Sequence, residues 1–245
     1  MSSRTPLQFY DEPLPGVDAS GLRGKLIVIE GADSVGRSTQ VAHLRFWLEQ
    51  RGHAVVDTGR GRSALTKKGI EQAKEGHMLG PTTMTLFYAT DFADRLEHEI
   101  LPALRAGFVV LTDRYIFSLM ARAIARGRDP RWIETIAGIA LVPHAIYYLR
   151  AEVEDLVARV VVGRGSFEYW ESGMDVPLGR DRYESFVRYQ SRVIQALDEM
   201  AERYGFTTID AARSPEQIFR ELRRSIQRII SRKEPRGDST GLATA

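Results

Sequence analysis

The segment from Gly31 to Ser38 has the residue types and the spacing of a phosphate-binding loop. It reads Gly-Ala-Asp-Ser-Val-Gly-Arg-Ser and follows the pattern G-x-x-x-x-G-[K]-[S/T], with Arg37 in the place of the lysine. Glycines let the backbone turn tightly, and the N–H groups of such a turn form an anion cradle at the start of a helix. The Ser38 hydroxyl is suited to a phosphate-bound Mg²⁺ ion. The residues expected to hold the phosphates of ATP are Gly31, Asp33, Ser34, Val35, Gly36, Arg37, Ser38 and Thr39.

Arginine at position 37 leaves two interpretations open. A guanidinium group grips phosphate as a planar fork, whereas the lysine ammonium group acts as a compact point charge. One interpretation is an active enzyme with Arg37 as an adapted catalytic residue. The other is a loop that binds nucleotide and catalyses poorly. The remaining candidate site favours the first.

The elements on either side of this phosphate loop (residues 31–38) are those that such a site needs. Residues 25–30 form an apolar run typical of a buried strand. Residues 39–51 predict an amphipathic helix, whose apolar face carries Val41, Leu44, Trp47 and Leu48. A strand, the loop and a helix in this order make the phosphate-binding interpretation stronger than a glycine-rich turn that only starts a helix.

Strand-like and helical segments alternate along the rest of the chain. A long helix is predicted from Pro81 to about Arg105. Repeated βα units predict an α/β fold of three layers, the P-loop NTPase fold, in which helices cover both faces of a five-stranded parallel sheet. The further strands are predicted at residues 54–58, 108–112, 145–149 and 207–209.

Composition and charge narrow the class of protein. The chain of 245 residues is 43% hydrophobic and 27% charged, as in globular proteins, and its net charge is only +2. We therefore expect no nucleic-acid polymer as a partner and, without an apolar run of spanning length, no membrane. The absence of cysteine excludes disulfides and thiol catalysis and fits a cytoplasmic location. Residues 1–23 are interpreted as an N-terminal extension, residues 24–230 as one domain and residues 231–245 as a mobile tail.

A second acidic residue is predicted at the same edge of the sheet. The apolar run at residues 108–112 leads into Asp113, Arg114 and Tyr115. A carboxylate at the carboxyl end of a parallel strand beside a phosphate loop can hold Mg²⁺ or its water, so Asp113 and Ser38 are the candidate metal ligands. Arg114 would clamp the phosphate of a second substrate. A surface ion pair is the alternative for Asp113.

Taken together, these motifs resemble the thymidylate kinase family of phosphate-loop nucleoside monophosphate kinases, from about residue 24 to residue 230. The family transfers the γ-phosphoryl group of ATP to dTMP with Mg²⁺, and its members form homodimers; both are expectations here. The motifs that carry the resemblance are Glu30-Gly31-x-Asp33-x-x-Gly36-x-Ser38-Thr39-Gln40, Leu86-Phe87-Tyr88-Ala89-Thr90-Asp91, Leu101-Pro102-Ala103-Leu104, Asp113-Arg114-Tyr115-x-x-Ser118-x-x-Ala121 and Thr208-Ile209-Asp210-Ala211.

The resemblance implies roles for four residues near the acceptor nucleotide. Asp33 matches the carboxylate near the sugar and phosphate of the monophosphate, and Arg114 matches the arginine that holds its phosphate. Tyr88 stands where the family has a phenylalanine that stacks on thymine; a core role is the alternative. Ser118 matches a serine that follows Arg114, either as a polar contact near the acceptor or as an ordinary helix residue.

Four departures from the family pattern concentrate on the acceptor side. Besides Arg37, residues 58–63 (Thr-Gly-Arg-Gly-Arg-Ser) replace an Arg-Glu-Pro segment, and Arg60 or Arg62 is a candidate phosphate ligand unless this loop is simply solvated. Phe92 replaces an arginine near the base, a region that Arg95 would reach from one helical turn away. Arg122 and Ala123 replace a Tyr-Gln pair, which makes Arg122 a further substrate-binding candidate.

A glycine-punctuated segment at residues 163–182 predicts a short lid over the ATP phosphates. Closure of such a lid excludes water, and a cation on it would stabilise the transferring phosphoryl group. Arg164 is the preferred catalytic cation among Arg159, Arg164, Arg180 and Arg182. The aromatic run at residues 167–171 either anchors the closed lid or contacts a neighbouring subunit.

Three functions are weighed from the sequence. The first is an ATP-dependent nucleoside monophosphate kinase that prefers dTMP and makes dTDP. The second is a kinase for another deoxynucleotide, nucleotide or nucleoside, which Phe92, Arg122 and Ala123 keep open. The third is a catalytically weak nucleotide-binding paralogue, suggested by Arg37 and the missing glutamate.

Overall fold

Five parallel strands form the central sheet of the protein. The computed structural model describes residues 7–17, 19–76, 79–176 and 178–231. The strands follow the order β2-β3-β1-β4-β5, and every neighbouring pair is parallel. Their bounds are Lys25–Gly31 (β1), Val55–Gly59 (β2), Val109–Asp113 (β3), Ala145–Arg150 (β4) and Thr207–Asp210 (β5).

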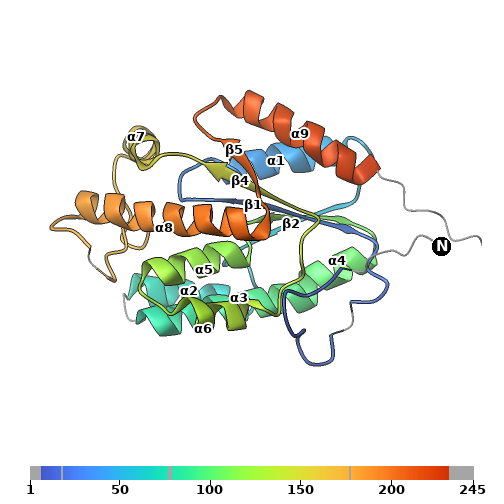
Figure 1. Ribbon diagram of the computed structural model, residues 1–245, viewed down its shortest axis with the longest axis horizontal. Helices are drawn as coiled ribbons and strands as arrows, with labels where there is room; N and C mark the ends of the chain where they lie inside the picture. The colour runs from blue at the N-terminus through green and yellow to red at the C-terminus, as the bar shows by residue number, and fades with distance from the viewer. Residues whose placement is uncertain (1–6, 18, 77–78, 177, 232–245) are drawn as a thin grey trace, which may run out of the picture.

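Helices cover both faces of this sheet (Figure 1). Helices α1 and α9 lie on one side, and α3, α5 and α6 lie on the other, where α8 packs against α5. The helices are α1 (Arg37–Glu49), α2 (Lys67–Glu75), α3 (Pro81–Arg95), the π-helix η1 (Leu96–Ile100), α4 (Leu101–Arg105), α5 (Ile116–Ala125), α6 (Pro130–Ala137), α7 (Val153–Arg164), α8 (Arg182–Tyr204) and α9 (Pro215–Ser231).

Alternation along the central strands divides the apolar core between the two faces. In β1, Ile27 and Ile29 pack with α1 and α9, whereas Leu26 and Val28 pack with η1, α4 and α5. All four are fully buried, as expected for a strand covered on both sides. The carboxyl end of the central strand is therefore held in a rigid layer, and the phosphate loop follows directly from it.

The predicted three-layer α/β fold is confirmed, and all five strands lie within one residue of the expected positions. The predicted helix from Pro81 to about Arg105 is a continuous helical run with a π-helical turn inside it. None of the described helices is long and apolar enough to cross a membrane.

Part of the N-terminal extension packs on the domain. Tyr10 makes edge-to-face contacts with Phe117 and Tyr204, at ring-centroid distances of 5.9 and 5.4 Å. The backbone N–H of Tyr10 donates to the carbonyl of Ala140, and Phe9 forms a β-bridge with Leu141. Residues 1–6 of this extension, and residues 232–245 of the tail predicted as mobile, lie outside the described residues.

Candidate active site

The phosphate loop joins β1 to α1 in the predicted conformation for an anion cradle. Gly36 lies directly before α1 with a φ of 99°, a left-handed conformation that favours glycine. Gly31 has a φ of 152°, and a Cβ there would approach the carbonyl oxygen of Leu149 to 2.7 Å. Ser34 also has a positive φ, 63°, although it is not glycine. At Gly31 and Gly36 the backbone of the loop therefore has a conformation that a residue with a side chain would adopt only with strain.

Arg37 lies folded into this loop. Its Nε donates to Asp113 Oδ1 at 2.9 Å, and its Nη1 donates to the carbonyl oxygens of Gly31, at 2.7 Å, and of Ala32. The Ser38 hydroxyl donates to the other carboxylate oxygen of Asp113 at 2.7 Å. Burial alone would raise the pKa of Asp113, but Arg37 and the bond from Ser38 lower it overall. The carboxylate is therefore ionised at neutral pH and bound to the last two residues of the loop.

Arg114 is held in a strained conformation beside the loop. Its φ is 73°, and its backbone N–H donates to the carbonyl oxygen of Ile29 at 3.0 Å. The fully buried carboxylate of Glu30 accepts the N–H groups of Tyr115 and Ser118, at 2.7 and 3.2 Å, and so caps the first turn of α5. Burial raises the pKa of Glu30. This contact between β1 and α5 fixes the turn that carries Arg114.

Asp33 joins the phosphate loop to two arginines. Its carboxylate pairs with Arg114 and Arg122 and accepts a hydrogen bond from Gln190 of α8 at 3.1 Å. Burial opposes ionisation, yet Arg114 and Arg122 hold the pKa of Asp33 well below its usual range. Burial and nearby Arg37 lower the pKa of Arg114 to about 9, so its guanidinium group stays protonated at neutral pH.

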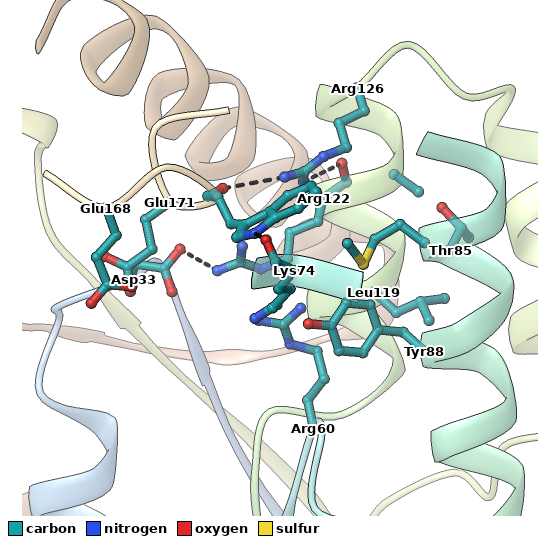
Figure 2. A pocket seen from close by; sticks show the side chains of 13 residues that line it. Asp33, Arg60, Lys74, Thr85, Tyr88, Leu119, Arg122, Arg126, Glu168 and Glu171 are labelled. Atoms are coloured by element: carbon teal, nitrogen blue, oxygen red, sulfur yellow. Dashed lines mark hydrogen bonds and ion pairs between the residues drawn. The ribbon is translucent and has the colours of Figure 1, made fainter. Parts of the chain in front are cut away.

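A cavity of about 180 Å³, the Asp33 cavity, opens beside this cluster (Figure 2). Figure 2 shows Asp33 joined to Arg122 on one side and Tyr88 of α3 on the other. Around Asp33, Arg60 Nε and Arg122 Nε of the lining and Arg114 Nη1 just outside it are buried without a hydrogen-bond partner, and further such atoms, Trp47 Nε1 and Arg128 Nε among them, lie elsewhere in the described residues. Because buried donors are almost always paired, these three N–H groups indicate a site for an anion. The other lining residues are Lys74, Met84, Thr85, Leu119, Ala123, Arg126, Glu168, Trp170 and Glu171.

Arg60, one of the two candidate phosphate ligands of residues 58–63, lines this cavity. Its guanidinium carbon lies 4.3 Å from the ring centroid of Tyr88. Burial and the charge of Arg122 lower the pKa of Arg60. Its neighbour Arg62 is exposed and pairs with Asp57, so only Arg60 of the two candidates reaches the cavity.

Asp91 explains why the Arg60 loop (residues 59–66) is drawn inward. Its fully buried carboxylate accepts the backbone N–H groups of Gly61 and Ser63, both at 2.9 Å, and the hydroxyl of Thr66 at 3.2 Å. At the start of the loop, a Cβ on Gly59 would lie 2.5 Å from the carbonyl oxygen of Asp113. Strand β2 therefore approaches β3 at a distance that only glycine allows.

Three candidate acceptor-side residues, Arg95, Arg114 and Ser118, lie outside the lining of this cavity, and Arg114 reaches it only through its pair with Asp33. Arg95 is 1% exposed and pairs with Asp91 at 3.1 Å. It balances the buried negative charge of the carboxylate that holds the Arg60 loop. Ser118 is 2% exposed, and its hydroxyl donates to Glu30 at 2.5 Å, so it supports the first turn of α5. The expected contacts of Arg95 and Ser118 with the acceptor stay predictions, and in this structure both side chains hold neighbouring elements in place.

A second cavity, the Gly36 cavity, lies on the other side of the phosphate loop. It measures about 380 Å³ and is lined by Ser34, Gly36, Thr39 and, from α7, Arg159. Arg159 donates to the carbonyl oxygen of Val35 at 2.8 Å. Arg164, at the end of α7, donates to the Ser34 hydroxyl at 2.9 Å and pairs with Glu168 and Glu171. The phosphate loop thus separates two cavities, with arginines on both sides.

Three residues of the site are assigned here without having been singled out as site residues from the sequence. Glu30 and Gln190 hold the Asp33 and Arg114 cluster, and Trp170 lines the Asp33 cavity. Glu30 lies within the motif that carries the resemblance, and Trp170 lies in the aromatic run at residues 167–171. No local signal marked Gln190, which is one polar residue on a long amphipathic helix.

Known thymidylate kinases are similar to this chain over most of its length. A profile described as "Thymidylate kinase" matches residues 29–222. The chain is 34% identical over 210 residues to "Probable thymidylate kinase 2" of Saccharolobus solfataricus, which covers 85% of this chain and 98% of that protein. It is 33% identical over 220 residues to "Thymidylate kinase" of Clavibacter michiganensis subsp. michiganensis, covering 86% and 98% of the two chains.

Proposed function

Because the chain belongs to the thymidylate kinase family, we propose how its residues phosphorylate dTMP to dTDP with ATP as the donor. Of the three functions weighed from the sequence, the family and the relatives support the kinase that uses dTMP. The observation that carries the assignment of residues is the pair of cavities divided by the phosphate loop. We assign ATP to the Gly36 cavity and dTMP to the Asp33 cavity.

The charge of the Asp33 cavity suits a phosphate monoester. Around Asp33, the guanidinium groups of Arg60, Arg114 and Arg122 leave two positive charges in excess of its carboxylate. The remaining charged residues of the lining, Lys74 and Arg126 against Glu168 and Glu171, balance one another. A phosphate monoester carries a charge between about −1.5 and −2 at pH 7. The three unpaired N–H groups of these arginines supply donors for its oxygens.

Transfer from ATP needs no general base in this site. The attacking group is a phosphate oxygen of dTMP that is already ionised at neutral pH. As its bond to the γ-phosphorus forms, the bond from that phosphorus to the bridging oxygen of ADP breaks. The protein contributes alignment and positive charge. We assign Arg37 to the transferring phosphoryl group and Arg114 to the phosphate of the acceptor. Arg164 contacts the transferring group from the lid.

Ser38 and Asp113 fit a Mg²⁺ ion carried by the nucleotide. Both present oxygen atoms, the ligands that Mg²⁺ prefers, and they lie in contact at 2.7 Å. A bound Mg²⁺ ion would neutralise charge on the β- and γ-phosphates. Arg37 keeps the Asp113 carboxylate ionised and turned toward the loop.

A coupled assay of ADP release over a panel of nucleoside monophosphates tests the assignment. We expect turnover with dTMP to exceed that with dCMP, dAMP and dGMP. Turnover confined to another monophosphate would refute dTMP as the substrate, and tight ATP binding without any turnover would favour the nucleotide-binding paralogue. From the family resemblance we also propose that the protein is a cytoplasmic homodimer. Sedimentation velocity tests whether it forms the dimer.

A further inference from the structure

We propose that Trp170 is the aromatic side chain that contacts the base of the acceptor nucleotide, in place of Tyr88. The inference rests on the proposed function, because it names how the acceptor is held in the Asp33 cavity. It changes the expectation from the family pattern, in which the residue at position 88 stacks on thymine.

The ring of Tyr88 is covered in this structure. The Arg60 guanidinium group lies over it at 4.3 Å, and Figure 2 shows the two side chains in contact range at the wall of the cavity. Tyr88 is 8% exposed and packs in a cluster with Ile70, Met84 and Leu119. A base would reach the ring only after Arg60 had moved away.

Several contacts keep Arg60 where it lies. The backbone directly after Arg60 is anchored by Asp91, which accepts the N–H groups of Gly61 and Ser63, has no exposed surface and is itself paired with Arg95. A guanidinium group is attracted to the face of an aromatic ring, and more strongly where water is excluded. The Arg60 and Tyr88 pair is therefore a fixed wall of the cavity.

Trp170 supplies the other aromatic surface of the cavity. Its indole N–H donates to the carbonyl oxygen of Lys74 in α2 at 3.1 Å, and its backbone carbonyl accepts from Arg126 of α5 at 3.2 Å. The Tyr169 ring contacts it edge-to-face at 5.1 Å. These contacts hold the indole as part of the apolar lining, together with Met84, Leu119 and Ala123.

The position of Trp170 in the chain links the base to the lid. Trp170 lies in the segment at residues 163–182, whose Arg164 contacts Ser34 of the phosphate loop at 2.9 Å. A base packed against Trp170 therefore favours the same closed position of this segment that places Arg164 at the phosphate loop. Binding of dTMP and binding of ATP are expected to strengthen each other.

Fluorescence gives a direct test that needs no turnover. The chain has three tryptophans, so a W47F/W132F variant leaves Trp170 as the only one. Titration with dTMP should quench or shift the emission of Trp170, because the base displaces water from the indole. Should this variant bind any monophosphate of the panel, measured by calorimetry, without a change in emission, the inference is overturned.

Kinetics give the second test. Stacking of a base on an aromatic side chain is worth about 1–3 kcal/mol, so Trp170→Leu should raise the KM for dTMP roughly 5- to 150-fold. The Kd for ATP, measured by calorimetry without dTMP, should stay nearly unchanged. Trp170→Phe should recover most of the loss. Trp132→Leu, at an exposed position outside the cavity, is the matched control.

The outcomes distinguish an error in the role of Trp170 from an error in the proposed function. If Tyr88→Leu raises the KM for dTMP and Trp170→Leu does not, Tyr88 is the stacking residue and the inference about Trp170 is wrong, although the kinase function stands. If the wild-type enzyme does not turn over dTMP, the proposed function fails, and the fluorescence titration over the panel still decides the role of Trp170.

Discussion

Replacing Arg37 by lysine tests whether the site depends on the geometry of arginine or only on its charge. Arg37 uses Nε for Asp113 and Nη1 for two carbonyl oxygens of the phosphate loop, from a side chain that is 7% exposed. The ammonium group of lysine keeps the charge, but it lacks the fork that reaches Asp113 and the loop carbonyls together.

The size of the effect follows from the hydrogen bonds lost. One hydrogen bond to a charged group contributes about 1.5–3 kcal/mol. If the loss acts on the folded state, Tm should fall by about 3–12 °C for a domain of this size. If the same contact persists during transfer, kcat should fall roughly 10- to 150-fold, because each 1.36 kcal/mol in the barrier is a factor of ten.

The assay is the coupled measurement of ADP release with dTMP, combined with calorimetric melting. Arg45→Lys is the matched control, because Arg45 lies on the same helix and is an exposed residue that pairs with Glu49 at 2.9 Å and with Asp57 at 3.8 Å. Such a pair is worth well under 1 kcal/mol, so neither kcat nor Tm should change appreciably. An Arg37→Lys enzyme with unchanged or increased kcat and the wild-type Tm would refute the reasoning and show a tolerant variant of the usual loop.

Three further predictions concern the acceptor side and the N-terminal extension. Arg114→Ala should reduce turnover of dTMP at least tenfold, because Asp33 loses one of its two charged partners; unchanged rates in the coupled assay would exclude Arg114 from the acceptor site. The unfolded pKa of Asp33 is near 3.8 and its folded pKa is lower, so its contribution to stability is present above pH 3.8 and is lost as the pH falls below it. Melting curves from pH 7 to pH 3 should show this loss, and Asp33→Asn should flatten it. Tyr10→Ala removes two edge-to-face contacts worth about 0.5–1.5 kcal/mol each. Chemical denaturation should therefore show a free energy of unfolding lower by at least about 1–3 kcal/mol. An unchanged free energy of unfolding would mean that the extension does not stabilise the domain.

The fold was predictable because its signals are local. Apolar runs bounded by glycine or charged residues marked each strand, and the shifts of one residue at the strand ends occur where the ladder continues into polar residues. Asp113 is an example: the sequence places it after the strand, whereas it is the last residue of β3 and pairs with Ile29 of β1. The position of the phosphate loop follows from the same local signals.

The wall of the Asp33 cavity was harder to predict, because it depends on distant charges. Residues 58–63 have the composition of a solvated turn, and only a buried carboxylate about 30 residues away, Asp91, brings Arg60 inside. The same carboxylate takes Arg95 out of reach of the acceptor. Spacing along a helix placed Arg95 one turn from Phe92, yet it gave no information on the buried carboxylate with which Arg95 pairs.

Gly59 restricts how this enzyme's loop can evolve. Because no side chain fits between β2 and the backbone of Asp113, a single mutation cannot restore a long residue at the start of residues 59–66. A change to the family's Arg-Glu-Pro segment would require simultaneous changes in the spacing of β2 and β3, in Asp91 and in the loop itself. Laboratory selection for altered acceptor preference is therefore better begun from the lid than from this loop.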